Sequence, residues 1–132
     1  VDAVAGIVAA TGAEAAISAA DVELAGDAAT HIGQRLLAGG QVRVGEQTFD
    51  VCATGGHTAG GVSLIHPKGC AFVGDALFAG SLGGTRKRPD FDGQIAAVSR
   101  GLLSLPGETT LYPGHGPATT VAEELLHNPF FV

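Results

Sequence analysis

Three short apolar segments of this chain each lead into a glycine-containing loop that carries a histidine or an aspartate. The segments are FDVCA (49–53), CAFV (70–73) and TTLY (109–112), and the polar residues that follow them are His57, Asp75 and His115. Apolar runs of four to eight residues bounded by glycine or proline are typical of buried strands. Because α/β proteins place their sites on loops at the carboxyl ends of strands, we expect these three side chains to meet.

The chemistry of the three side chains indicates a shared metal site. Imidazole and carboxylate groups are ligands that zinc and iron accept. The flanking glycines allow sharp turns and close approach of neighbouring chain segments. A single histidine is more often a structural residue than a ligand, so three separate structural residues remain an equal alternative from chemistry alone.

The rest of the chain predicts alternating strands and helices, which indicates an α/β or layered αβ fold. The expected elements are a helix at 4–10 ended by Gly12, a strand at 13–19, a turn of helix capped by Asp21, a helix near 32–37, a hairpin turning at 45–46, a strand pair turning at 67–69, a helix at 91–105 capped by Asp90 or Asp92, a strand at 109–112, and a last helix with a capping box of Thr120 and Glu123.

Composition narrows the class of protein. With 132 residues, 45% of them hydrophobic and 15% charged, the chain suits one packed domain. Its formal net charge of -6 argues against a nucleic-acid partner, and no apolar run is long enough to predict a membrane span. Two cysteines do not make a disulfide framework, so we expect buried thiols and a cytoplasmic protein. Because a helix is predicted from the first residue onward, we also expect the chain to be N-terminally incomplete.

Four separated motifs resemble the metallo-β-lactamase fold hydrolases, in particular their glyoxalase II-like (hydroxyacylglutathione hydrolase-like) branch. The motifs are TGGHTAGG, VGDALFAGS, LYPGHG and HNPFF. The first three are similar to the family patterns T-P-G-H-T-x-G, G-D-x-L-F-x-G-S and P-G-H-G. The resemblance implies an αβ/βα sandwich. It implies that residues 1–132 form a single domain, mainly the C-terminal part of that fold, which lacks the N-terminal strands.

The resemblance also assigns metal ligands. It implies that His57, Asp75 and His115 bind metal, together with Asp2 as the aspartate of the family motif H-x-H-x-D-H. Asp2 would also orient the attacking water as a catalytic residue; the alternative is a carboxylate that favours a helix N-terminus. Ala3 stands where the family motif has a histidine, and the two leading histidines would precede Val1.

These departures affect the number of metal ions. One metal position keeps two ligands, His57 and Asp75, whereas the other keeps Asp2, Asp75 and His115. Since a zinc site uses three protein ligands plus water, we expect weak or single-metal binding. The resemblance implies zinc, as one or two ions, with iron as an alternative.

The implied function is metal-dependent hydrolysis of a small-molecule thioester or ester through a metal-bound hydroxide. Arg86 and Lys87 could contact an anionic substrate such as a glutathione carboxylate, or could form a solvated loop. Two alternatives stay open: a persulfide dioxygenase-like enzyme with a single iron, and a non-catalytic fragment or pseudoenzyme, which Ala3 favours. Enzymatic activity of this chain therefore stays uncertain at this point. Apolar strands without covering partners also predict self-association.

Overall fold

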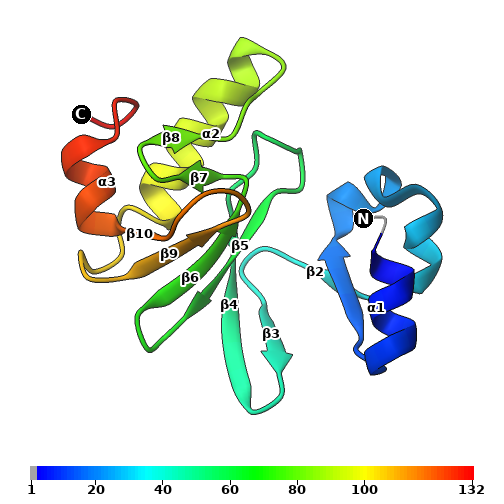
Figure 1. Ribbon diagram of the computed structural model, residues 1–132. Helices are drawn as coiled ribbons and strands as arrows, with labels where there is room; N and C mark the ends of the chain where they lie inside the picture. Colours follow the sequence, from blue (N-terminus) through cyan, green and yellow to red (C-terminus); the bar gives the residue numbers. More distant parts are fainter. Residues whose placement is uncertain (1–2) are drawn as a thin grey trace.

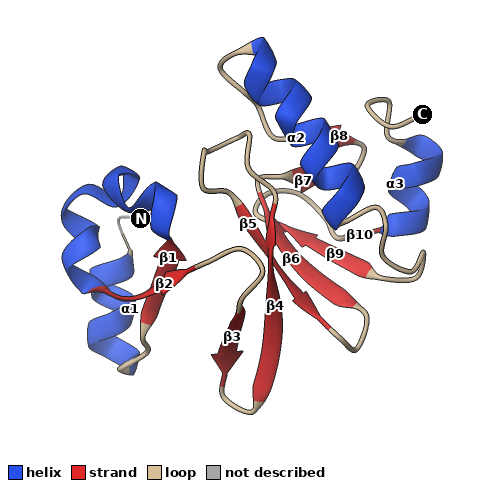
Figure 2. Ribbon diagram, turned by 180° about the vertical axis from the view of Figure 1, so that it is seen from behind, coloured by secondary structure: helices blue, strands red, loops and turns tan. Residues whose placement is uncertain are grey.

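The structure, a computed structural model that describes residues 3–132, is a mixed α/β fold built on one large sheet (Figures 1 and 2). In chain order its elements are α1 (Val4–Thr11), β1 (Ala15–Ser18), the 3₁₀ segment η1 (Ala19–His31), β2 (Ile32–Leu36), β3 (Gln41–Val44), β4 (Gln47–Ala53), β5 (Val62–His66), β6 (Cys70–Gly74), β7 (Leu77–Phe78), β8 (Ser81–Leu82), α2 (Arg88–Gly101), β9 (Thr110–Pro113), β10 (Thr119–Thr120) and α3 (Val121–His127). The large sheet has six strands in the order β10-β9-β6-β5-β4-β3, whereas β1 pairs with β2 and β7 with β8.

Strands β4, β6 and β9 run in the same direction across the large sheet. Both β4 and β6 are antiparallel to β5, which lies between them, and β6 pairs in parallel with β9. Their carboxyl ends therefore lie at one edge of the sheet. The loops that follow these three strands, which carry the three polar residues singled out in the sequence, leave the sheet at this edge.

Helices α2 and α3 cover one face of the sheet (Figure 2). The cluster beneath them draws side chains from β6, β9, the β7–β8 hairpin and both helices: Ala71, Val73, Leu77, Val98, Leu102, Leu111 and Val121. Each large aliphatic side chain buried in this way stabilises the fold by about 1.5–3 kcal/mol. This core fixes β6 and β9, and with them the starting points of two of the three polar loops.

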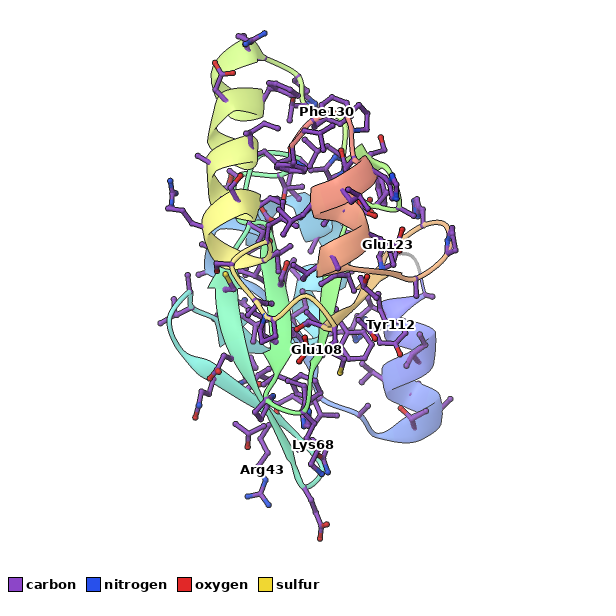
Figure 3. The ribbon with its side chains drawn as sticks, turned by 90° about the vertical axis from the view of Figure 1, so that its left-hand side faces the viewer. Arg43, Lys68, Glu108, Tyr112, Glu123 and Phe130 are labelled. Carbon is purple, nitrogen blue, oxygen red and sulfur yellow. The ribbon has the colours of Figure 1, made fainter. Side chains whose placement is uncertain are left out.

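The opposite face of the sheet carries a smaller cluster of Leu36, Val42 and Val51. Beyond this cluster, Phe72 and Tyr112 are 48% and 43% exposed, and their rings stack with centroids 5.4 Å apart. Figure 3 shows Tyr112 on β9, on the side of the sheet away from α2. Part of this face therefore presents aromatic surface, and self-association through it stays a prediction.

The first four elements pack together beside the β3–β4 side of the sheet (Figure 1). Helix α1 ends at Gly12, whose φ of 68° is the left-handed conformation that glycine adopts readily. The predicted helix at 4–10 and strand at 13–19 are both confirmed within a few residues. The helix expected near 32–37 is wrong: this segment is β2, which pairs in parallel with β1 through alternating half-buried and exposed side chains.

The long helix also starts and ends earlier than predicted. Helix α2 begins at Arg88 after the N-cap residue Lys87, with a proline in its first turn, and neither Asp90 nor Asp92 caps it. The carboxylate of Asp92 instead lies 2.9 Å from Arg88 Nε, one turn earlier in the helix. The proline explains the earlier start, because its fixed φ suits the first helical turn.

The turn predictions hold at both hairpins and at the last helix. The chain reverses between β3 and β4 at Gly45, whose φ is 60°, and between β5 and β6 at Gly69, whose φ is 89°. The hydroxyl of Thr120 accepts a hydrogen bond from the Glu123 amide at 3.2 Å, which is one of the two bonds of the predicted capping box. None of the helices in residues 3–132 has the length and hydrophobicity needed to span a bilayer.

Candidate metal centre

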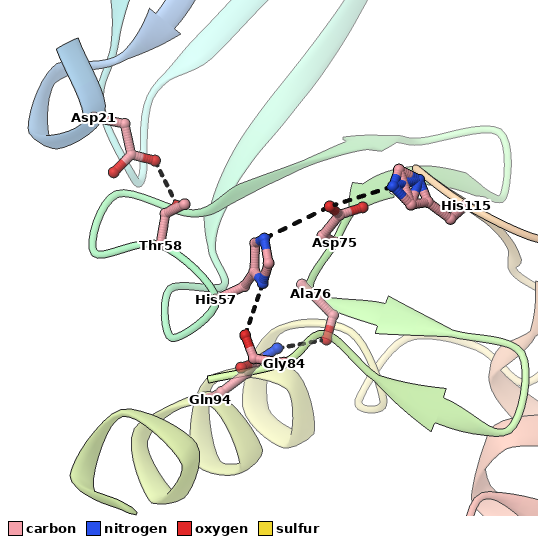
Figure 4. A network of polar contacts seen from close by, with 8 residues as sticks. All are labelled: Asp21, His57, Thr58, Asp75, Ala76, Gly84, Gln94 and His115. Carbon is pink, nitrogen blue, oxygen red and sulfur yellow. Dashed lines mark hydrogen bonds and ion pairs between the residues drawn. The ribbon is translucent and has the colours of Figure 1, made fainter. Parts of the chain in front are cut away.

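The carboxylate of Asp75 lies between two imidazoles at the edge where β4, β6 and β9 end (Figure 4). His57 Nε2 is 3.6 Å and His115 Nε2 is 4.0 Å from the same atom, Asp75 Oδ2. Two ligands on one tetrahedral zinc ion, each bonded at 2.0–2.2 Å, stand roughly 3.4 Å apart. The structure therefore brings together the three residues expected to meet, at separations slightly longer than a filled site would have.

The hydrogen bond made by His57 fixes the orientation of its ring. Its Nδ1 lies 2.8 Å from the main-chain carbonyl of Gly84, so Nδ1 carries a proton and donates it. In the neutral imidazole this leaves the lone pair of Nε2 directed at Asp75 Oδ2. A lone pair facing a carboxylate is stabilised when a cation lies between them, and metal-binding histidines commonly donate their other N–H to a carbonyl. The donor set therefore fits a metal ion.

His115 is held less firmly than His57. Its side chain is 76% exposed, against 42% for His57 and 29% for Asp75. Its ring stacks on Phe78 of β7, with the ring planes 5° apart and the centroids separated by 6.0 Å. Among residues 3–132, no group of three or more His, Cys, Asp and Glu side chains lies close enough together, as it stands, to hold a metal ion. His115 must therefore move toward Asp75 if the three are to share one ion.

Glycines allow the main chain to approach Asp75 closely. Gly74 has a φ of 53° and turns the chain out of β6 immediately before Asp75. A methyl group on Gly114 would overlap Asp75 Oδ1, and one on Gly83 would overlap the Asp75 carbonyl oxygen. The glycines that surround the motif residues are thus needed for the position of the carboxylate.

Gly114→Ala is expected to weaken zinc binding about tenfold, because the new methyl group would push the Asp75 carboxylate away from both imidazoles, and displaced partners of a ligand typically cost 10–100-fold. A competition titration of zinc against a chromophoric chelator measures the change in Kd. Gly6→Ala is the control, since a methyl group there meets no atom within 4 Å. Unchanged zinc affinity in Gly114→Ala would contradict this account of the carboxylate.

The remaining sequence-predicted residues have different places. Asp2 lies outside the described residues. Arg86 lines an open cavity of about 680 Å³ together with His57 and Asp90. Lys87 is the exposed N-cap residue of α2, on a neighbouring surface with Arg88. Arg86 is therefore the basic residue that shares a cavity with the histidine.

Two further residues near the centre were not predicted from the sequence as parts of the site. The carboxylate of Asp21, expected to cap a turn of helix, instead accepts hydrogen bonds from Thr58 and Gly60, which follow His57 in the chain. Gln94 of α2 is fully buried and donates from Nε2 to the Ala76 carbonyl at 2.9 Å, whereas its Oε1 has no partner among residues 3–132. A polar residue inside an apolar helix face was the available signal for Gln94.

The chain is similar to several known proteins, although no protein-family model matches it. Hydroxyacylglutathione hydrolase GloC of Haemophilus influenzae is 38% identical over 84 residues, which cover 62% of this chain and 40% of that protein. The chain spans less than half the length of the first curated relatives it matches.

Two solved structures resemble the fold along almost the whole chain. TTHA1623 in a di-iron-bound form superposes with a TM-score of 0.76 and 34% identity, covering 97% of this chain and 70% of that one. BLEG-1 B3 metallo-beta-lactamase superposes with a TM-score of 0.84 and 27% identity, covering 96% of this chain and 69% of that one. Each superposition thus covers at least 96% of this chain.

Proposed function

Because the chain belongs to the metallo-β-lactamase fold hydrolases, we propose that it serves in metal-dependent hydrolysis of a thioester or ester. The observation that carries this proposal is the position of Asp75 Oδ2 opposite both imidazole Nε2 atoms, at 3.6 and 4.0 Å. The likeness to a hydroxyacylglutathione hydrolase supports a thioester as the substrate class.

His57, Asp75 and His115 would hold the metal, which we propose to be zinc. The di-iron-bound form of TTHA1623 supports iron as the alternative. A bound ion of either kind would activate a water molecule and polarise the carbonyl of the substrate. Asp2, the residue that the resemblance assigns to orient this water, stays a proposal from sequence.

The residues of the chain would orient the metal ligands and attract the substrate. Asp75 supplies negative charge to both imidazoles, and the Gly84 carbonyl keeps the His57 ring in the orientation that presents Nε2. Arg86 lines the cavity beside His57, so its guanidinium would attract a carboxylate of an anionic substrate such as a glutathione thioester. Lys87, next to it in the chain, is exposed on the neighbouring surface with Arg88 and would offer a second positive charge to such a substrate.

A second function, oxygen chemistry at a single iron, is favoured by the composition of the donor set. Two histidines and one carboxylate with open positions are the ligands of non-haem iron oxygenases. Asp75 with His57 and His115 is such a set. The second candidate is therefore a persulfide dioxygenase-like enzyme with one iron.

Metal loading followed by two assays separates these functions. Protein loaded with Zn²⁺, or with Fe²⁺ under nitrogen, is analysed for metal content, then assayed for thiol release from a glutathione thioester and for oxygen uptake with glutathione persulfide. We expect about one zinc ion per chain, the number that one set of three ligands supports. We also expect slow thioester cleavage that a chelator abolishes.

His57→Ala should lose both the metal and the cleavage, whereas His31→Ala, at an exposed position in η1, should retain both. Oxygen uptake without thioester cleavage would replace the first function with the second. Bound metal without either reaction would show a non-catalytic protein, and failure to bind any metal would contradict both functions.

A further inference from the structure

The carboxylate of Asp21 joins the N-terminal region to the loop that carries His57. Thr58 Oγ1 donates a hydrogen bond to Asp21 Oδ2 at 2.6 Å (Figure 4). The Gly60 amide donates to Asp21 Oδ1 at 2.8 Å. We propose that Asp21 is a positioning residue that holds this loop in the conformation that presents His57 to a metal ion. Its effect on metal binding rests on the proposed function; its effect on the loop does not.

The loop between β4 and β5 needs an anchor because of its composition. Residues 54–61 include four glycines among eight residues. Glycine loses more conformational freedom on ordering than any other residue, so a loop of this kind is costly to fix. Three main-chain hydrogen bonds close the loop on itself, from Thr54 N to Gly61 O, from Gly56 N to Thr58 O and from Gly61 N to Thr58 O. They set its internal shape but do not tie it to η1.

The hydrogen bonds that Asp21 accepts from the loop are of the strong, charge-assisted kind. Hydrogen bonds to an ionised carboxylate are roughly twice as strong as those between neutral groups. Both of its oxygens are engaged by the loop, one by a side chain and one by the main chain. The carboxylate is therefore occupied in holding the loop, which distinguishes its role from that of Asp75.

The packing at Gly60 shows independently that the loop and the N-terminal region fit closely. A methyl group on Gly60 would lie 2.5 Å from Ser18 Oγ and 2.8 Å from Asp21 Cγ, closer than real Cβ atoms come. Ser18, at the end of β1, is buried. The loop therefore packs directly against the β1–η1 junction. The hydrogen bonds of Asp21 to the loop lie within this contact.

The consequence for metal binding follows from the position of Thr58. It is the residue next to His57, and its hydroxyl bond stops that part of the loop from rotating. Without Asp21, the loop would sample more conformations, and a metal ion would have to order it on binding. Residues that orient a ligand in this way typically change metal affinity 10–100-fold.

Four variants test the positioning role. Asp21→Ala and Thr58→Val should each raise the zinc Kd about tenfold or more. Asp27→Ala, at an exposed position in the same η1 segment, should leave it within about twofold, since surface changes of this kind have small effects.

Asp21→Asn should restore part of the affinity, since its hydrogen bonds are neutral and therefore roughly half as strong. Its amide oxygen can accept from Gly60, and its amide nitrogen can donate to the Thr58 hydroxyl, which is also an acceptor. This pattern separates a hydrogen-bonding role from a role of the negative charge, because the asparagine carries none.

Amide hydrogen exchange in the metal-free full chain gives a second readout. The Gly60 amide should exchange about tenfold faster in Asp21→Ala, since it loses a hydrogen bond to a charged group, while thermal unfolding checks that the variant is folded. Unchanged exchange at Gly60 would overturn the proposal.

Zinc binding as tight as in the wild type, despite faster exchange, would overturn the proposed effect on the metal. If the wild type binds neither zinc nor iron, the proposed function fails, and exchange at Gly60 then decides the positioning role alone.

Discussion

Asp75→Asn is expected to lower the zinc affinity of the protein by more than about 100-fold, because removal of a direct ligand must exceed the 10–100-fold that loss of an orienting partner costs. The same Asp75 oxygen faces both His57 and His115. The substitution therefore removes a negative charge from any metal site that uses either imidazole. The asparagine keeps the shape and one carbonyl oxygen, which leaves the charge as the main change. A competition titration and elemental analysis of the purified protein measure the loss.

Asp50→Asn is the matched control. Asp50 is an exposed aspartate of β4 whose carboxylate accepts a hydrogen bond from Gln41 at 2.8 Å, far from the loops at the carboxyl edge. The control should bind zinc like the wild type. If Asp75→Asn also binds zinc with wild-type affinity, the metal lies elsewhere and the candidate centre is wrong.

Gly83→Ala should lower the free energy of unfolding by about 3 kcal/mol or more, at the upper end of what overpacking costs. Gly83 is buried behind Asp75, and a methyl group there would overlap the Asp75 carbonyl oxygen and lie 3.3 Å from Gln94 Nε2. The first of these atoms belongs to the main chain, which cannot rotate aside as a flexible side chain can. Urea unfolding followed by circular dichroism measures the change.

The neighbouring position provides a control one residue away. A methyl group on Gly84 meets no atom within 4 Å, and its carbonyl can still accept from His57. Gly84→Ala should therefore unfold at nearly the urea concentration of the wild type. Equal midpoints for Gly83→Ala and Gly84→Ala would show that the chain behind Asp75 can relax, and that the carboxylate is held less tightly than its surroundings indicate.

The meeting of His57, Asp75 and His115 could be predicted because the signal is local. Each residue follows an apolar run and sits among glycines, and such runs end where strands end. What the sequence did not contain was the common direction of β4, β6 and β9, which depends on how distant strands pair. The family resemblance supplied that information indirectly, and the likeness to solved structures confirms the fold.

Asp21 was misassigned because its partners are remote in the chain. An aspartate ahead of an apolar stretch matches a helix cap, which is a contact within a few residues. Its actual partners, Thr58 and Gly60, are 37 and 39 residues away. Local sequence patterns cannot show whether a carboxylate accepts hydrogen bonds from nearby or from distant residues. The contact of Asp21 with the loop could therefore be recognised only in the folded structure.

The misassigned β2 has a related cause. The segment at 32–37 has neither clear alternation nor clear helical spacing, and its strand form depends on parallel pairing with β1. Tertiary pairing of this kind overrides weak local preference.

The stacked pair of Phe72 and Tyr112 has a spectroscopic consequence. The chain has one tyrosine and no tryptophan, so its near-ultraviolet emission comes almost entirely from Tyr112. That ring is half exposed on the sheet face opposite α2. The intrinsic fluorescence of the unlabelled protein therefore reports on this one face of the sheet. If a second copy of the chain or another molecule covers the face, a neutral quencher should reach Tyr112 less readily and quench its emission less.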